Sequence, residues 1–184
     1  MANKKLLVFS DSHGSLSALK ALFNWAKERH SPNGTIIASA FLGDGFSDLQ
    51  KAAEATGFLS DWKIVCGNND YTHHIQEAAV FDLADHRFFM CHGHRQSIYR
   101  GYHLLLSAAK NNGADVALFG HSHVPFYENI DGISLINPGS VARPRSKTGA
   151  TFAVIECPEG EPVIVEFFGV DDNGVIKKIN FPNS

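Results

Sequence analysis

Short apolar runs recur along the first two thirds of the chain, and stretches with helical spacing lie between some of them. The runs have the length and the β-branched and aromatic content of buried strands, and they cover residues 6–9, 36–42, 62–66, 87–91 and 116–119. Apolar residues at helical spacing follow the first run (Leu16, Leu19, Leu22, Phe23 and Ala26) and precede the last (Tyr99, Tyr102, Leu105, Leu106 and Ala109). This alternation predicts an α/β fold built on a sheet.

The pattern changes after residue 123, where strand-like runs follow one another closely. They cover residues 126–129, 133–136, 151–156 and 163–170, and turn-forming residues at 131–132 and 158–160 separate them. This spacing predicts antiparallel sheet in the last third of the chain. Because no internal repeat or long linker divides the sequence, we expect a single domain over residues 1–184.

Composition narrows the classes of partner. The 184 residues carry a net charge of −3, so no basic patch for nucleic acid is expected. The first apolar run is broken at once by polar residues, so we expect neither a signal peptide nor a membrane span, and a cytoplasmic location. The three cysteines match no redox or zinc spacing and are predicted to be buried, reduced thiols. A homo-oligomer is left open.

Polar residues that can bind metals stand directly after the apolar runs, at Asp11, Asp44, Asn68, His92 and His121. In open α/β sheets this edge is where ligands bind. Three of these positions carry a second polar residue two places on, giving Asp11 with His13, His92 with His94, and His121 with His123. In extended backbone such pairs share one face. Five of the ten histidines fall in these pairs, which random scatter rarely produces.

The set offers only oxygen and nitrogen donors: Asp11, His13, Asp44, Asn68, His92, His121 and His123. One tetrahedral ion needs fewer ligands than this, so the pattern predicts two divalent metals. Such donors suit manganese, iron, zinc, cobalt or nickel, and the residues alone do not rank these ions. Manganese is our first expectation, and magnesium is a further candidate.

The order of these motifs resembles the signature of the calcineurin-like metallophosphoesterase superfamily. The matching segments are Asp11-x-His13, Gly43-Asp44, Gly67-Asn68, His92-Gly93-His94 and Gly120-His121-x-His123. The small size, the His-Gly-His form and the segment Asn137-Pro138-Gly139-Ser140 resemble its compact bacterial and archaeal phosphodiesterase subgroup.

The resemblance implies both a fold and a ligand assignment. The fold is α/β, a two-sheet β-sandwich flanked by helices in four αββα layers. One ion would be held by Asp11, His13 and His123, the other by Asn68, His92 and His121, with Asp44 bridging them.

Two departures from the family pattern affect the predicted chemistry. The usual Gly-Asp-x-x-Asp motif has one extra residue before Asp48, so Asp48 is left out of the predicted site. The usual Gly-Asn-His-Asp motif reads Gly67-Asn68-Asn69-Asp70, so Asn69 replaces the imidazole that typically assists the leaving group.

The predicted function is metal-dependent hydrolysis of a small phosphate ester, with diesters preferred over monoesters, by attack of a metal-activated hydroxide on phosphorus. Asn69 and His94 are the candidate catalytic residues, and Asn69, His94 and Ser140 the candidate substrate contacts. The alternative is a scaffold or binding protein on the same fold, as in a retromer subunit. Because every expected metal position is filled, the enzyme is favoured.

Several residues have a simpler interpretation. We expect surface or structural roles for His30, His73, His74, His86 and His103, which lie outside the ordered set. Residues 137–140 form either a plain turn or a phosphate contact. A solvated loop is favoured for Arg143, Arg145 and Lys147, although one of them could steer an anionic substrate.

Overall fold

The computed structural model describes residues 3–29, 36–72 and 74–181. The strands within them are β1 (Lys4–Phe9), β2 (Ile36–Phe41), β3 (Asp61–Ile64), β4 (Ala78–Leu83), β5 (His86–Cys91), β6 (Val116–Leu118), β7 (Pro125–Ile130), β8 (Ile133–Pro138), β9 (Ala150–Cys157), β10 (Ile164–Val170) and β11 (Ile176–Ile179). The helices are α1 (Leu16–Lys27), α2 (Phe46–Thr56), the 3-10 turn η1 (Ile98–Arg100) and α3 (His103–Asn111).

The strands form two sheets. One has the order β11-β10-β9-β1-β2-β3, and the other has the order β4-β5-β6-β8-β7. The centre of each sheet is parallel: β1 pairs with β2 and β2 with β3 in the first, and β6 pairs with β5 and β8 in the second. Several parallel strands of both sheets therefore end in loops that are free to carry a site.

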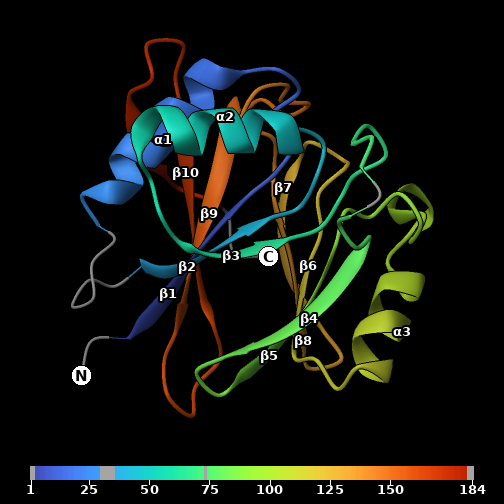
Figure 1. Cartoon of the computed structure of the whole chain (residues 1–184). Helices are drawn as coiled ribbons and strands as arrows, with labels where there is room; N and C mark the ends of the chain where they lie inside the picture. Colours follow the sequence, from blue (N-terminus) through green and yellow to red (C-terminus); the bar gives the residue numbers. More distant parts are fainter. Residues whose placement is uncertain (1–2, 30–35, 73, 182–184) are drawn as a thin grey trace.

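Both faces of β1 are apolar, because the strand is covered on both sides. Leu6 and Val8 belong to the core between the sheets, which also contains Phe88 from β5. Leu7 and Phe9 point the other way and pack against α1 and α2. On the second sheet, α3 covers the outer face, at the opposite side of the molecule from α1 and α2 (Figure 1). The four layers are therefore αββα, which confirms the expected fold class.

The last third of the chain is largely antiparallel, as predicted, but it divides between the two sheets. Strands β7 and β8 pair antiparallel and β8 joins β6, whereas β9, β10 and β11 extend the first sheet beside β1. The predicted helix from Tyr99 begins later, at His103, because Tyr99 lies in η1. Helix α2 and strands β4 and β11 were not predicted individually.

The cysteines lie inside the fold. All three are buried and unpaired, and burial raises the pKa of Cys91 and Cys157 to about 12. They therefore stay protonated, in agreement with the expectation of inert thiols. None of the helices in the described ranges has the length and apolar character of a membrane span.

Truncation of the ring at the sheet interface tests the packing. Phe88 is fully buried, and its ring stacks on that of Phe81 with centroids 4.9 Å apart. Phe88→Ala should lower the free energy of unfolding by about 3–5 kcal/mol, because it removes apolar contacts and leaves a cavity. Urea-induced unfolding of chelator-treated protein measures the change.

The control is Val80→Ala on the neighbouring strand, where the side chain is 42% exposed and the change should stay within about 0.5 kcal/mol. If Phe88→Ala cost no more than this control, the sheet interface would not be the principal core.

Candidate metal centre

The predicted donors follow the carboxyl ends of five strands. Asp11 and His13 follow β1, Asp44 follows β2, Asn68 follows β3, His92 follows β5, and His121 and His123 follow β6. The loops from the two sheets contact each other: the backbone N–H of His121 donates to Asp11 Oδ2 at 3.1 Å, and His92 Nδ1 lies 2.7 Å from the carbonyl oxygen of Leu42. The structure thus brings the predicted residues to one edge of the sandwich.

Five of the seven donors form two close groups that share a carboxylate: Asp11 with His13 and His123, and Asp11 with Asp44 and His92. In the first group, Asp11 Oδ1 lies 3.1 Å from His123 Nε2 and 3.6 Å from His13 Nε2. In the second, Asp44 Oδ2 lies 3.4 Å from His92 Nε2. Because Asp44 Oδ2 is also 3.7 Å from His13 Nε2, both carboxylates lie between the groups.

The imidazoles present bare nitrogens to these carboxylates. His92 Nδ1 faces the carbonyl of Leu42, and His123 Nδ1 lies 2.6 Å from the carbonyl of Arg143, so each Nδ1 carries the proton and donates it. Each Nε2 then has a lone pair directed at the centre. Within the described ranges, His92 Nε2 and Asp11 Oδ1 are buried without a hydrogen-bond partner. Converging lone pairs of this kind fit a cation.

The carboxylates are held in their charged form. Burial alone would raise the pKa of Asp44, but the facing imidazole of His92 and hydrogen bonds from Asn69 lower it to about 2. For Asp11, burial is likewise outweighed, by His123, His13 and His92, and its pKa lies well below the usual range. Both residues are therefore anionic at neutral pH.

The remaining predicted residues surround the two close groups. The ring of His121 lies 5.0 Å from that of His92 between centroids, and the ring of His94 lies 5.5 Å from it. Burial, which disfavours the protonated ring, lowers the pKa of both His94 and His121. Asn68 is exposed and lines a cavity with His121 and His123.

The backbone is strained where it carries the donors. Eight described non-glycine residues have positive φ, and five of them are candidate ligands: Asp11, His13, Asp44, His121 and His123. A non-glycine residue in this region costs on the order of 1–3 kcal/mol and persists only where surrounding contacts enforce it.

Asp70, which was not among the predicted site residues, supplies the largest set of hydrogen bonds that hold these strained loops. Its carboxylate accepts hydrogen bonds from the backbone N–H groups of Asp44, Gly45, Phe46 and Gly67. The signal was available, because Asp70 closes the Gly67–Asp70 motif. Gly67 is required at its position, since a Cβ there would meet Asp44 Oδ1 at 2.1 Å.

Asn69 also contacts Asp44. Its backbone N–H donates to Asp44 Oδ1 at 2.8 Å, and its side-chain Nδ2 donates to Asp44 Oδ2 at 2.6 Å. The amide predicted to lie beside the leaving group is therefore oriented toward a candidate ligand.

Three further residues support the other loops. Asp48 accepts hydrogen bonds from Ser12 Oγ and the N–H of Gly14, which fixes the loop that carries His13. Asn137 Nδ2 donates to the carbonyl of Gly120, before His121. Ser140 is fully buried, and its hydroxyl donates to the carbonyl of Asp11 and accepts the N–H of Arg143. The structure thus places Ser140 behind Asp11, with its hydroxyl proton donated to the Asp11 carbonyl.

The loop at residues 143–145 borders the site. His123 makes hydrogen bonds to both ends of this loop. Its Nδ1 donates to the carbonyl of Arg143, and its backbone carbonyl accepts the N–H of Arg145 at 3.0 Å. Arg143 and Arg145 both line a cavity of about 450 Å³ beside His121 and His123. Arg143 and Arg145 are exposed, as expected for a solvated loop, and they also border the site, whereas Lys147 lines neither cavity at the site.

The other histidines lie elsewhere. His86 is buried, with Nδ1 2.5 Å from Asp115 Oδ2, and His74 and His103 are exposed. His30 and His73 lie outside the described residues.

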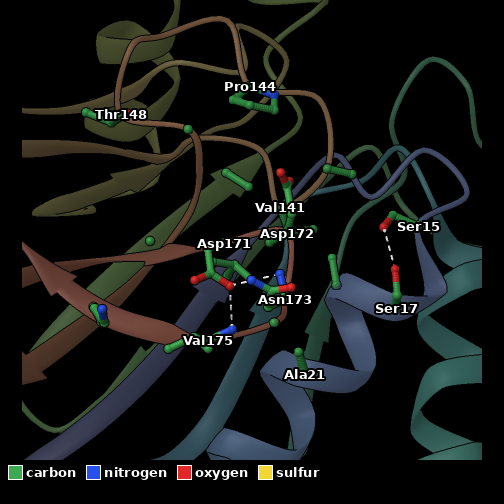
Figure 2. Close-up of a pocket in the computed structure, with 18 of the residues that line it drawn as sticks. Ser15, Ser17, Ala21, Val141, Pro144, Thr148, Asp171, Asp172, Asn173 and Val175 are labelled. Atoms are coloured by element: carbon green, nitrogen blue, oxygen red, sulfur yellow. Dashed lines mark hydrogen bonds between the residues drawn. The ribbon is translucent and has the colours of Figure 1, made fainter.

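A larger cavity, about 690 Å³, contains none of the candidate ligands (Figure 2). It lies between α1, the loop after β8 and the turn between β10 and β11, and its lining includes Ala21, Val141 and Val175. Asp171 in this lining accepts hydrogen bonds from the N–H groups of Asn173 and Val175. Donor chemistry rather than cavity size therefore locates the candidate site.

Comparisons with known proteins agree with this geometry. The sequence profile of the calcineurin-like phosphoesterase superfamily domain matches residues 5–160. A probable metallophosphoesterase of Mycoplasma pneumoniae is 35% identical over 145 residues, which span 77% of this chain and 82% of that protein. A phosphodiesterase of Methanocaldococcus jannaschii is 28% identical over 144 residues, 73% of this chain and 82% of that protein.

A solved structure from Streptococcus pneumoniae, described as a predicted phosphoesterase, superposes with a TM-score of 0.75 at 25% identity. The match covers 97% of this chain and 98% of that one. Family profile, relatives and fold together support a phosphoesterase function with divalent metal binding. The chain belongs to the calcineurin-like phosphoesterase superfamily.

Proposed function

We propose that this chain is a dinuclear metal-dependent phosphoesterase that acts preferentially on phosphodiesters. The observation that carries the proposal is the convergence of Asp11, Asp44 and the bare Nε2 atoms of His92 and His123 within a buried centre. A buried arrangement of anions and lone pairs is costly unless cations occupy it.

The donors divide between two ions. Asp11, His13 and His123 would hold one, and Asn68, His92 and His121 the other, with Asp44 between them and manganese as the first choice of ion. When bound, such ions supply a water nucleophile near neutral pH and neutralise charge on the phosphoryl oxygens. The mixed oxygen and nitrogen donors also suit iron, zinc, cobalt or nickel.

The chain's own residues position this centre and receive the substrate. Asn69 donates hydrogen bonds to the carboxylate of Asp44, and Asp70 accepts the backbone N–H of Asp44. An amide has no proton to give to a departing alkoxide, so Asn69 orients Asp44 rather than acting as a general acid. His94, whose pKa is lowered by burial, is neutral near pH 7 and would orient a metal-bound group or contact the phosphate.

Two observations favour diesters. The M. jannaschii relative is named a phosphodiesterase. In addition, cavities of about 540 and 450 Å³ both include His13 and Asp44 in their linings, which leaves room for an ester group on each side of phosphorus. The alternative is a non-catalytic scaffold on the same fold, and the presence of a residue at every expected metal position favours the enzyme.

Metal content tests the proposal first. Chelation should abolish hydrolysis of bis(p-nitrophenyl) phosphate, and Mn²⁺ should restore it with about two ions bound per chain, as measured by plasma mass spectrometry. His123→Ala should lose metal and activity, whereas His103→Ala, at an exposed position on α3, should retain both. Full activity in protein verified to be free of metal would refute the proposal.

Asp70 should control metal affinity without touching the ions. In Asp70→Asn, one carboxylate oxygen becomes an NH₂ group facing backbone N–H donors, so the loop that carries Asp44 loses support. The affinity for Mn²⁺ should fall about 10- to 100-fold in titrations against a chelating dye. Asp171→Asn is the control, because Asp171 also accepts two backbone N–H groups but lies in the turn after β10. Equal affinity for Mn²⁺ in the two variants would show that Asp70 does not support the metal site.

The absence of an imidazole at Asn69 predicts a strong dependence on the leaving group. Positioned general acids contribute about 10²- to 10⁴-fold in rate, and basic leaving groups need them most. Hydrolysis should therefore slow steeply as leaving-group pKa rises in a series of diesters, and Asn69→His should flatten the trend. A flat dependence in the unmodified protein, with chemistry rate-limiting, would show that another residue supplies the proton.

A further inference from the structure

Two cavities meet at the metal centre and differ in chemistry. Both are lined by His13, Asp44, Asn69 and Arg143. A diester whose phosphorus lies at this shared border would send one arm into each cavity. The residues that line only one cavity distinguish the two arms, and the shared Arg143 borders both.

The cavity of about 540 Å³ has aromatic walls. Phe46 packs against the core under α2, and its N–H is bound by Asp70, so it forms a fixed wall. Tyr71 is 99% exposed, so its ring is open to solvent. A large ring left open beside a reaction centre is available to stack on a planar group.

The carboxylates in this cavity do not make it a cation site. Asp48 and Asp70 also line it, but their oxygens accept hydrogen bonds from the loops they support. Among the residues that line this cavity alone, the side chains that make no such bond to the loops include the rings of Phe46 and Tyr71 and the hydroxyl of Ser47.

The cavity of about 450 Å³ is cationic, and Asp44 is the one carboxylate in its lining. Arg145 Nη1 donates to the hydroxyl of Tyr99 at 2.8 Å, which fixes that guanidinium. The backbone of Arg143 is anchored by His123, whereas its side chain has no acidic partner among residues 3–29, 36–72 and 74–181. An anchored arginine with a free guanidinium is suited to bind an anion.

We propose that the substrate is a nucleotide-like phosphodiester, with a planar aromatic group on one arm and a second negative charge on the other. Tyr71 and Phe46 hold the aromatic group, and Arg143 binds the second negative charge. This assignment rests on the proposed function, because it places phosphorus at the metal centre.

Binding of non-hydrolysable phosphonates to the Mn²⁺-loaded protein, measured by calorimetry, tests each arm separately. Phenylphosphonate carries a phenyl ring where methylphosphonate carries a methyl group, so the pair reports on the ring. Tyr71→Ala should weaken the binding of phenylphosphonate about tenfold and the binding of methylphosphonate less than about twofold. Leu59→Ala, another exposed apolar position that lines neither cavity, should change neither affinity.

The charged arm is tested with 3-phosphonopropionate and propylphosphonate, which differ by a carboxylate. Arg143→Gln should weaken the binding of 3-phosphonopropionate about tenfold more than the binding of propylphosphonate. Arg143→Lys should recover part of the lost affinity. Lys147→Gln, on the same loop but outside both cavities, is the matched control. Because Arg143 and Tyr71 have exposed side chains, these variants should keep the fold.

The outcomes separate the two proposals. If diesters are hydrolysed while Tyr71 and Arg143 variants bind all four phosphonates as the unmodified protein does, the substrate assignment is wrong and the function stands. If no ester is hydrolysed with any ion but the selective losses appear, the assignment of the arms stands and the catalytic function is wrong. Failure of all four phosphonates to bind the metal-loaded protein would overturn the substrate assignment.

Discussion

Two buried carboxylates facing unprotonated imidazole nitrogens are the constraint on which the rest of the structure depends. Asp11 and Asp44 stay anionic although burial opposes their charge. His92 and His123 use their Nδ1 protons on main-chain carbonyls, so their Nε2 atoms add lone pairs to the same centre. Such a centre is stable only if cations enter it and if the chain keeps its donors from moving apart.

The surrounding residues meet the second condition. Candidate ligands adopt positive φ in loops that would otherwise relax, and polar side chains fix these loops. Asp48 fixes the loop after β1, Asp70 the loop after β2, and Asn137 the loop after β6. The parallel strands bring the loops together, and these hydrogen bonds hold the loops in place.

The pattern of apolar runs predicted an α/β sheet with the polar donors at its edge, whereas the two-sheet sandwich was implied by the resemblance to the family. Each donor follows an apolar strand, so strand position alone places it at the sheet edge. The supporting contacts could not be predicted in this way: Ser140 binds the carbonyl of Asp11 across 129 positions, and Asp70 binds Asp44 across 26. The bond between His123 and the carbonyl of Arg143 could not be predicted either, because the two residues become neighbours only in the folded chain. Helix α3 starts late because Tyr99 turns back to the carbonyl of His121.

Anomalous diffraction from crystals grown with Mn²⁺ and recorded at the manganese edge tests the central claim most directly. The account predicts two anomalous peaks in each chain, one against Asp11, His13 and His123 and one against His92, with Asp44 in contact with both. A single peak, or peaks away from these residues in crystals where the loops keep their present positions, would contradict it.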